Sequence, residues 1–144
     1  MDDDEVARLE AAISDTWSWA RAAARAGAQA LDPRLDVTAY PLVSMVGWRG
    51  AMRPSELSAA LHLDRSTVSR QIDAAAKLGL LERAPDPADA RAITVRLTPA
   101  AQARMEALKE ARRERWRAAL ATWSPGDITD LSRLLGQLTE VDLG

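Results

Sequence analysis

Six side chains between residues 65 and 71 carry the kinds of donors and acceptors that bond to nucleic acids. They are Arg65, Ser66, Thr67, Ser69, Arg70 and Gln71. Guanidinium, hydroxyl and amide groups bond to base edges in the major groove of DNA and to phosphate oxygens. The cluster therefore indicates contact with DNA. For Ser66 and Thr67 a purely structural role stays open, because hydroxyl side chains also cap the first turn of a helix.

The spacing of the surrounding residues predicts that this cluster lies on a helix. At roughly 100° per residue, the apolar side consists of Val68, Ile72, Ala75 and Gly79. The opposite side consists of Ser66, Arg70, Asp73 and Lys77. Asp64 is a suitable N-cap, and a shorter helix opened by Pro54 precedes the turn at His62. The segment thus predicts a helix-turn-helix whose second helix presents a polar face.

A β-hairpin is predicted after the second helix. Its strands are expected from Leu80 to Ala84 and from Ile93 to Leu97, each bounded by turn-forming residues. In the second strand the inward-facing residues are expected to be Ile93, Val95 and Leu97. The loop at 85–91 contains two prolines and is expected to be stiff. Such a hairpin suits a wing that holds one side chain in a groove.

Apolar-striped helices are predicted at both ends of the chain. The first covers residues 4–31, and a second, nearly all-apolar helix is expected to start with Thr38 as its N-cap. A long helix is expected from Pro99 to about Trp123, and the segment 124–127 then opens a last helix. The terminal stripes are too long to be buried by so small a winged unit. We therefore expect them to pair with those of a second copy.

The composition restricts the compartment and the chemistry. The 144 residues include no cysteine, which excludes disulfides, thiolate metal sites and cysteine-based peroxide sensing. No apolar run is long enough to span a bilayer, and the acidic segment 1–5 is unlike a signal peptide. We therefore expect a cytoplasmic protein with no membrane partner.

The net charge of −2 is unevenly distributed along the chain. Acidic residues dominate the first 36 positions, whereas cationic residues occur throughout the helix-turn-helix and hairpin. The latter are Arg65, Arg70, Lys77, Arg83, Arg91 and Arg96. DNA affinity depends on such a local patch, so the acidic average does not exclude a nucleic-acid partner. A later basic run at 112–117 is interpreted as a solvated helix face paired with glutamates, with phosphate contact as the alternative.

No catalytic constellation is present in the sequence. It contains no G-x-S-x-G motif, no phosphate-binding loop, no cysteine and a single histidine, His62. This histidine is interpreted as structural or solvent-facing. The acidic residues 2–5 are interpreted as a frayed terminus and not as a cation site. We therefore expect no enzyme activity, no cofactor and no metal site.

Four segments follow one another in a distinctive order and spacing. They are SEL followed by Leu61 at 55–61, DRSTVSRQI at 64–72, LGLLER at 78–83, and D-x-R before V-x-LT at 89–98. Together they resemble the multiple-antibiotic-resistance regulator (MarR) family of bacterial winged-helix transcription factors. The resemblance implies a mainly α-helical fold with a small β-hairpin wing. It also implies a single domain over 1–144, with a DNA-binding winged helix-turn-helix lobe at 37–98 and dimerisation helices in 1–36 and 99–144.

The resemblance assigns roles to individual residues. The recognition helix, Ser66 to Lys77, would lie in a major groove, and Arg91 of the wing would lie in a flanking minor groove, oriented by Asp89. A minor groove with enhanced negative potential attracts a guanidinium, which supports the role of Arg91. The wing contact is weakened by Ala90, which stands where the family often has a basic residue. Further departures, which bear on packing, are Ala75, Ala101 and Arg53, where leucine, glycine and Ser or Thr are common.

Members of the family often bind small aromatic or phenolic effectors between the dimer helices and the DNA-binding lobes. The aromatic residues expected near that junction are Trp17, Trp19, Tyr40 and Trp48. They are candidates for a ligand pocket, and packing in the core or dimer interface is the alternative.

The combined prediction is a homodimeric, sequence-specific DNA-binding transcriptional regulator. The resemblance implies a ligand-responsive repressor that recognises an inverted repeat, that is, a pseudo-palindromic operator in double-stranded DNA. The alternative is a winged-helix architectural or protein-interaction module without sequence-selective DNA binding.

Overall fold

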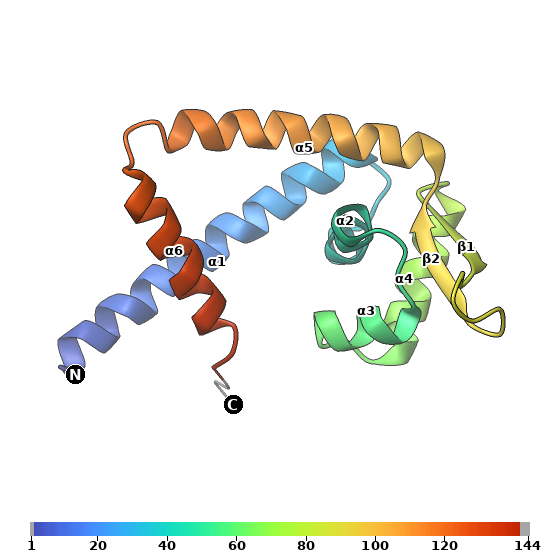
Figure 1. The fold of residues 1–144 in the computed structure, drawn as a ribbon, viewed down its shortest axis with the longest axis horizontal. Coiled ribbons are helices and arrows are strands. Elements are labelled where there is room, and N and C mark those ends of the chain that lie inside the picture. Colours follow the sequence, from blue (N-terminus) through green and yellow to red (C-terminus); the bar gives the residue numbers. More distant parts are fainter. Residues whose placement is uncertain (1, 142–144) are drawn as a thin grey trace. The chain divides into compact units, whose positions relative to one another are not determined.

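The computed structural model describes residues 2–141 and contains a winged helix-turn-helix (Figure 1). Its elements are α1 (Asp3–Leu31), the short 3-10 helix η1 (Val37–Ala39), α2 (Tyr40–Arg49), α3 (Pro54–Leu61), α4 (Arg65–Lys77), β1 (Leu81–Pro85), β2 (Ile93–Leu97), α5 (Pro99–Ala119) and α6 (Pro125–Leu138). The predicted fold class, mainly α-helical with a two-stranded wing and N- and C-terminal helices, is confirmed. Met1 and residues 142–144, which belong to the predicted dimerisation segments, lie outside the described residues.

The chain forms two compact units, one ending at Leu108 and the other beginning at Lys109. The core of the first unit gathers around α2, whose Leu42, Val43 and Val46 are buried. This helix contacts α1, α3, α4 and β2, as its nearly all-apolar sequence predicts. Other buried side chains in the same cluster are Leu31, Leu57, Val68, Ile72, Ala75, Leu80, Leu81, Val95, Leu97, Ala101 and Met105. No helix among residues 2–141 is both long enough and apolar enough to cross a bilayer.

The N-terminus of the central helix differs from the prediction. Thr38 was expected as the N-cap of this helix, but it lies within η1, which Asp36 caps, and the N-cap position of α2 is Ala39. The Asp36 carboxylate accepts both the backbone N–H and the hydroxyl of Thr38, at 2.7 and 2.6 Å. The hydroxyl of Thr38 is therefore committed as a donor to Asp36. Helix α2 then starts one turn later, with Pro41 in its first turn, where no amide partner is lost.

The hairpin is antiparallel, with Leu81 opposite Leu97 and Pro85 opposite Ile93. The first strand starts one residue later than predicted, because the N–H of Leu80 bonds to Ala75 O (3.0 Å) at the exit from α4. The expected inward direction of Ile93 is wrong: its side chain is 48% exposed, whereas Thr94 is buried. Ile93 belongs to the outermost pair of the hairpin, beyond the apolar core. The Thr94 hydroxyl donates to Ala84 O (3.3 Å), which satisfies its buried polar group.

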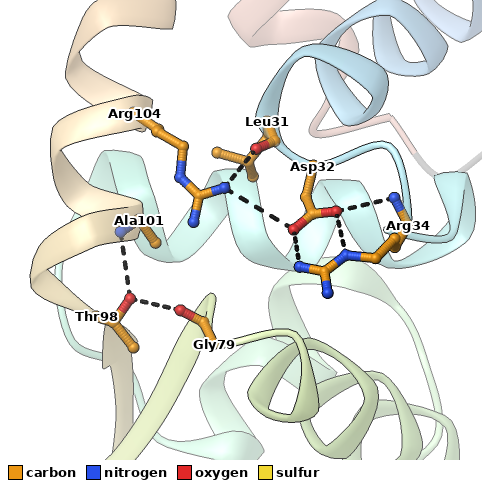
Figure 2. A network of polar contacts seen from close by, with 7 residues as sticks. All are labelled: Leu31, Asp32, Arg34, Gly79, Thr98, Ala101 and Arg104. Carbon is orange, nitrogen blue, oxygen red and sulfur yellow. Dashed lines mark hydrogen bonds and ion pairs between the residues drawn. The ribbon is translucent and has the colours of Figure 1, made fainter.

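A polar network joins the end of α1 to the start of α5 within the first unit (Figure 2). Asp32 follows α1 and is only 3% exposed, and the Arg34 guanidinium donates to both of its carboxylate oxygens, at 3.0 and 2.7 Å. Arg104 of α5 donates to Leu31 O (3.2 Å) and approaches Asp32 to 3.9 Å. Hydrogen bonds from Arg34 lower the pKa of Asp32 to about 2. The junction is thus held by a nearly buried carboxylate with two arginines beside it.

The second unit contains the C-terminal part of α5 and all of α6. Helix α5 ends at Ala119 and not near Trp123 as predicted, because i,i+3 backbone bonds such as Trp123 N to Leu120 O (3.0 Å) replace the helical ladder. Ser124 caps α6 and Asp127 closes the capping box, as predicted. In this unit four of the large apolar side chains of α6 are exposed, whereas Leu138 is partly buried. The exposed side chains are Ile128, Leu131, Leu134 and Leu135.

Two arginines of the basic run of α5 are paired with glutamates in the second unit. Arg113 contacts Glu110 (3.2 Å), and Arg117 contacts both Glu110 (3.3 Å) and Glu114. These bonds lower the pKa of Glu110, with the Arg113 guanidinium as the largest cause. The arrangement matches the interpretation of 112–117 as a solvated helix face with intrahelical ion pairs.

Candidate nucleic-acid interface

The first turn of α4 is organised by the carboxylate of Asp64. It accepts the backbone N–H and the hydroxyl of Thr67, at 2.8 and 2.7 Å, and the hydroxyl of Ser66, at 2.5 Å. These bonds, led by the one from Ser66, hold the pKa of Asp64 far below its usual range. Ser66 and Thr67 therefore take part in capping, the structural alternative predicted for them. Their hydroxyl oxygens still have lone pairs that can accept a bond.

The remainder of α4 separates into an apolar and a polar face, as its sequence predicts. Val68, Ile72 and Ala75 are buried, whereas Ser69 and Arg70 are exposed on the other side. One Arg70 nitrogen lies 3.3 Å from the Thr67 hydroxyl, a long contact that a stronger acceptor could replace. Arg70 is therefore presented by a rigid helix with its guanidinium available to an outside acceptor.

A shallow hollow lies beside the start of α4. It has a volume of about 290 Å³ and is lined by Pro54, Ser55 and Arg65. The first turn of α3 supplies two of these residues, and Arg65 is exposed at the first position of α4. The two helices of the helix-turn-helix thus meet at an open surface that carries one exposed guanidinium, that of Arg65.

Gln71 differs from the other predicted contact residues, because its amide is bonded within the fold. Its Nε2 donates to the backbone oxygen of Thr38 in η1, at 3.0 Å, and its Oε1 is buried without a hydrogen-bond partner in the described chain. This contact joins α4 to the segment before α2. It was not predicted, since two residues 33 positions apart carry no local sequence signal of their proximity.

Two acidic residues near this surface are neutralised by arginines. Asp73 of α4 bonds to Arg83 of β1 at 2.5 Å, and Glu82 of β1 bonds to Arg96 of β2 at 2.7 Å. The unfavourable charge that Asp73 would bring towards phosphate is therefore compensated by a neighbouring strand. The same pairs occupy Arg83 and Arg96, two members of the predicted cationic patch.

The tip of the wing is shaped by two aspartates. Asp86 Oδ1 accepts the N–H of Ala88 (2.8 Å), and Asp89 Oδ1 accepts the N–H of Arg91 (3.0 Å). Backbone bonds from Asp86 N to Ala92 O (3.0 Å) and from Ala92 N to Asp89 O (2.9 Å) close the turn. Asp89 thus holds the backbone of Arg91, whose side chain is exposed. The Asp89 carboxylate thus bonds to the backbone N–H of Arg91, whereas the predicted partner was the Arg91 guanidinium.

The sequence alone shows Arg53 only as a departure from the family pattern, whereas in the structure this residue contacts the wing. Its Nε donates to Asp86 Oδ2 at 2.6 Å. The pKa of Asp86 is lowered, first by the N–H of Ala88 and then by the Arg53 guanidinium. One sequence signal could have suggested a long-range role for Arg53, namely a cation at a helix N-cap. An arginine side chain cannot accept hydrogen bonds from the free backbone N–H groups of the first turn.

The four aromatic residues predicted for a ligand pocket lie on α1 and α2. Trp17, Trp19 and Trp48 are each about half exposed, at 59%, 54% and 49%. Tyr40 is partly buried and packs against the core, with its ring beside Gly27. A Cβ on Gly27 would lie 2.3 Å from the Tyr40 hydroxyl oxygen, so the helix can approach the ring only because residue 27 has no side chain.

Among residues 2–141, histidine and carboxylate side chains form no group of three or more that could hold a metal ion. His62, the single histidine, occupies the C-cap of α3 in the left-handed region with a φ of 53° and is exposed. Its conformation allows the sharp turn between α3 and α4.

Comparison with known proteins identifies the family to which the chain belongs. Residues 35–92, which span η1 through the tip of the wing, match the sequence profile of the MarR family. The HTH-type transcriptional regulator YxaD of Bacillus subtilis, itself uncharacterised, is 30% identical over 106 residues, which cover 74% of this chain and 71% of that protein. The chain belongs to the MarR family.

Further relatives agree with this assignment. The multiple antibiotic resistance protein MarR of Salmonella typhimurium is 34% identical over 67 residues, 45% of this chain and 46% of that protein. The chain thus matches about half the length of the Salmonella MarR. A crystal structure of a mutant MarR from E. coli complexed with operator DNA superposes with a TM-score of 0.69 at 20% identity, covering 96% of this chain and 99% of that one. This last likeness shows that the MarR fold extends over nearly the whole chain.

Proposed function

We propose that this MarR-family chain is a homodimeric transcriptional regulator that binds double-stranded DNA with sequence selectivity. The observation that carries the proposal is the rigid α4, which buries Val68 and Ile72 and presents Ser69 and Arg70 on its exposed face. A helix with short polar and guanidinium side chains on one face fits the major groove and can bond to base edges there. The E. coli MarR complex with operator DNA supports the same use of the fold.

Individual residues take different parts in the proposed contact. Arg70 and Ser69 face outward and would contact base edges, while Arg65, beside the hollow at the start of α4, would contact phosphate. Ser66 and Thr67, bonded to Asp64, would act as acceptors or through rotation of their hydroxyls. Gln71 would hold α4 in place through Thr38, in preference to contacting a base.

The wing would supply a second contact. Arg91 is exposed at its tip, and Asp89 fixes the backbone from which the side chain extends. An exposed guanidinium on a hairpin of this kind fits a narrow, electronegative minor groove flanking the major-groove site. Both proposed contacts belong to the same compact unit of the chain.

The proposed dimer is supported by apolar faces that a single chain leaves exposed. On α1 these include Leu9 and Trp17, and on α6 they include Leu134 and Leu135. Faces of this size are usually covered by a partner. Two copies related by a two-fold axis would place two α4 helices on half-sites about one helical turn, roughly 10 bp, apart, which is why the proposed operator is an inverted repeat.

Repression and its relief by a small aromatic or phenolic effector complete the proposal. The exposed rings of Trp17, Trp19 and Trp48 favour it, because aromatic surface is suited to binding such molecules. The same rings are suited to packing across a dimer. Quenching of tryptophan fluorescence by salicylate, compared between the parent chain and Trp48→Leu, distinguishes the two uses.

A binding-site selection tests the central claim. The purified protein is used to select duplexes from a randomised library, and its affinity for the selected duplex is compared with that for a shuffled duplex of equal composition. Regulators of this kind bind the specific site roughly 1,000-fold or more tighter. A ratio near unity would instead support a winged-helix architectural or protein-interaction module. An inverted repeat in the selected sequences supports the dimer.

A further inference from the structure

The base of the wing is held to the helix-turn-helix by backbone bonds. Met52, just before α3, forms an isolated bridge with Val95 of β2: Met52 N lies 3.0 Å from Val95 O, and Val95 N lies 2.7 Å from Met52 O. Both residues are buried. The outer half of the hairpin, from Pro85 to Ile93, extends beyond this attachment, and Ile93 at its start is half exposed. Arg91 therefore lies on a segment that the bridge does not fix.

A second attachment reaches that outer segment through a side chain. The Arg53 backbone is fixed because its N–H bonds to the Glu56 carboxylate (2.6 Å) in the first turn of α3. From this fixed point the guanidinium extends to Asp86, with its Nε 2.6 Å from Oδ2. Asp86 is 11% exposed and Arg53 39% exposed, so the carboxylate is largely covered where the two meet.

The position of Asp86 determines that of the rest of the wing tip. Its other carboxylate oxygen caps Ala88, and its own N–H bonds to Ala92 O. Ala92 in turn bonds to Asp89 O, and Asp89 accepts the N–H of Arg91. A continuous series of hydrogen bonds thus runs from the N-cap of α3 to the backbone of Arg91.

We propose that the Arg53–Asp86 ion pair is a positioning contact that fixes the wing tip, and with it Arg91, relative to α3 and α4. Arg53 is a positioning residue and does not itself contact DNA. Ion pairs whose arginine stays exposed to solvent contribute little to stability, so the contribution of this pair lies in geometry. The inference rests on the proposed DNA binding, in which the wing tip would have a fixed position.

A double-mutant cycle measures the effect. Binding to the duplex selected above is measured for the parent, Arg91→Ala, Arg53→Thr and the double variant. Threonine is a good N-cap and lacks the guanidinium, so Arg53→Thr keeps the helix start and removes only the ion pair. If the pair positions Arg91, the factor by which Arg91→Ala weakens binding falls by roughly threefold or more in the Arg53→Thr background. An unchanged factor would overturn the proposal.

Asp86→Asn gives a second, milder route to the same test. Asparagine keeps an oxygen to accept the N–H of Ala88 but removes the charge that Arg53 contacts, so it should also reduce the Arg91 factor. Arg96→Thr is the matched control. It removes one arginine and one ion pair from the same hairpin, but its partner Glu82 lies directly opposite it on the paired strand. The Arg91 factor should be unaffected in this control.

Amide hydrogen exchange tests the positioning without DNA. In Arg53→Thr and Asp86→Asn the amides of Ala88, Arg91 and Ala92 should exchange faster, while those of Met52 and Val95 keep the parent rate. Unchanged exchange at the wing tip would overturn the proposal even if the variants bound DNA weakly. If the parent chain shows no preference for the selected duplex, the proposed function fails, and the exchange rates still decide whether Arg53 positions the wing.

Discussion

The side-chain nitrogen of Gln71 lies 3.0 Å from the backbone oxygen of Thr38, which joins the helix that presents the polar surface to the segment between α1 and α2. The bond joins two residues 33 positions apart in the chain, one in α4 and the other in η1. It explains how α4 is held at its outer edge, beyond the buried Val68 and Ile72. Replacing Gln71 therefore tests whether this residue positions α4 or contacts a base.

Gln71→Ala should lower the free energy of unfolding by about 1 kcal/mol, the net value of one hydrogen bond. Urea denaturation at fixed protein concentration measures this. Gln102→Ala is the control, because Gln102 is an exposed residue of α5 whose side chain bonds to Glu106 on the same helix, at 2.7 Å. If Gln71→Ala kept full stability but lost discrimination at one base pair of the selected duplex, Gln71 would be a base contact after all.

Arg70→Ala and Arg91→Ala should weaken DNA binding in different ways. Loss of a base contact by Arg70 should cost about 1–3 kcal/mol on the selected duplex and much less on a shuffled one. Loss of Arg91 should weaken binding to both duplexes and reduce the slope of log affinity against log salt by about 1. Fluorescence anisotropy titrations at several salt concentrations measure both effects. Two variants that bound like the parent at every salt concentration would show that DNA is contacted elsewhere.

The Asp32 carboxylate should make the first unit sensitive to acid. Its pKa is lowered to about 2 by the hydrogen bonds from Arg34, whereas the same group has a pKa near 3.8 without them. Between these values the unfolded chain binds more protons than the folded one, so the free energy of unfolding should fall as the pH drops from about 4 to about 2. Asp32→Asn should remove this part of the pH dependence in thermal melts. Asp15→Asn, which removes a charge from the exposed surface of α1, should retain it.

Two glycine replacements should change stability in opposite directions. Gly27→Ala places a methyl group 2.3 Å from the Tyr40 hydroxyl oxygen and should cost about 1–3 kcal/mol, because the ring must move out of a packed site. Gly136→Ala lies in α6 with no neighbour within 4 Å in the described chain, and should raise stability by up to about 1 kcal/mol through helix propensity. Chemical denaturation measures both. A stable Gly27→Ala variant would mean that Tyr40 has another place to pack.

The exposed apolar face of α6 should determine the oligomeric state. Leu134→Glu introduces a charge among the exposed Leu131, Leu135 and Ile128, and should shift the protein towards monomer in sedimentation equilibrium. Thr129→Glu, on the same helix, introduces the same charge away from that face, where the Thr129 hydroxyl donates to Pro125 O (2.9 Å), and should leave the oligomer intact. A parent chain that sediments as a monomer at all concentrations would contradict the proposed dimer.

Local sequence signals predicted most of the fold, because they act over one turn of helix or one strand pair. Asp64 and Ser124 cap their helices, Pro54 opens α3, and Val68 and Ile72 are buried as the 3.6-residue period requires. The errors occur where a neighbouring group competes with the local preference. Asp36 uses the hydroxyl of Thr38 and thereby moves the helix start.

The parts of the candidate site that escaped prediction depend on contacts between distant residues. Two such contacts join residues 33 positions apart, namely Arg53 with Asp86 and Gln71 with Thr38. Neither contact has a local sequence signal, because it forms only in the folded chain. Ile93 was placed inward because strand alternation does not show where the hairpin leaves the core. Residue types and periodicity thus identify the surface, whereas the contacts that orient it require the tertiary structure.

The arginine pairs on the hairpin have a kinetic consequence for a protein that must find a rare site. Arg83 and Arg96 are already neutralised by Asp73 and Glu82, so they release few counterions when the lobe meets random DNA. In the proposed function, residence on non-specific sequence would therefore be short at physiological salt, and the search would proceed by dissociation and rebinding more than by long sliding. Fewer molecules would then be held on non-specific DNA, so a smaller pool would fill a single operator.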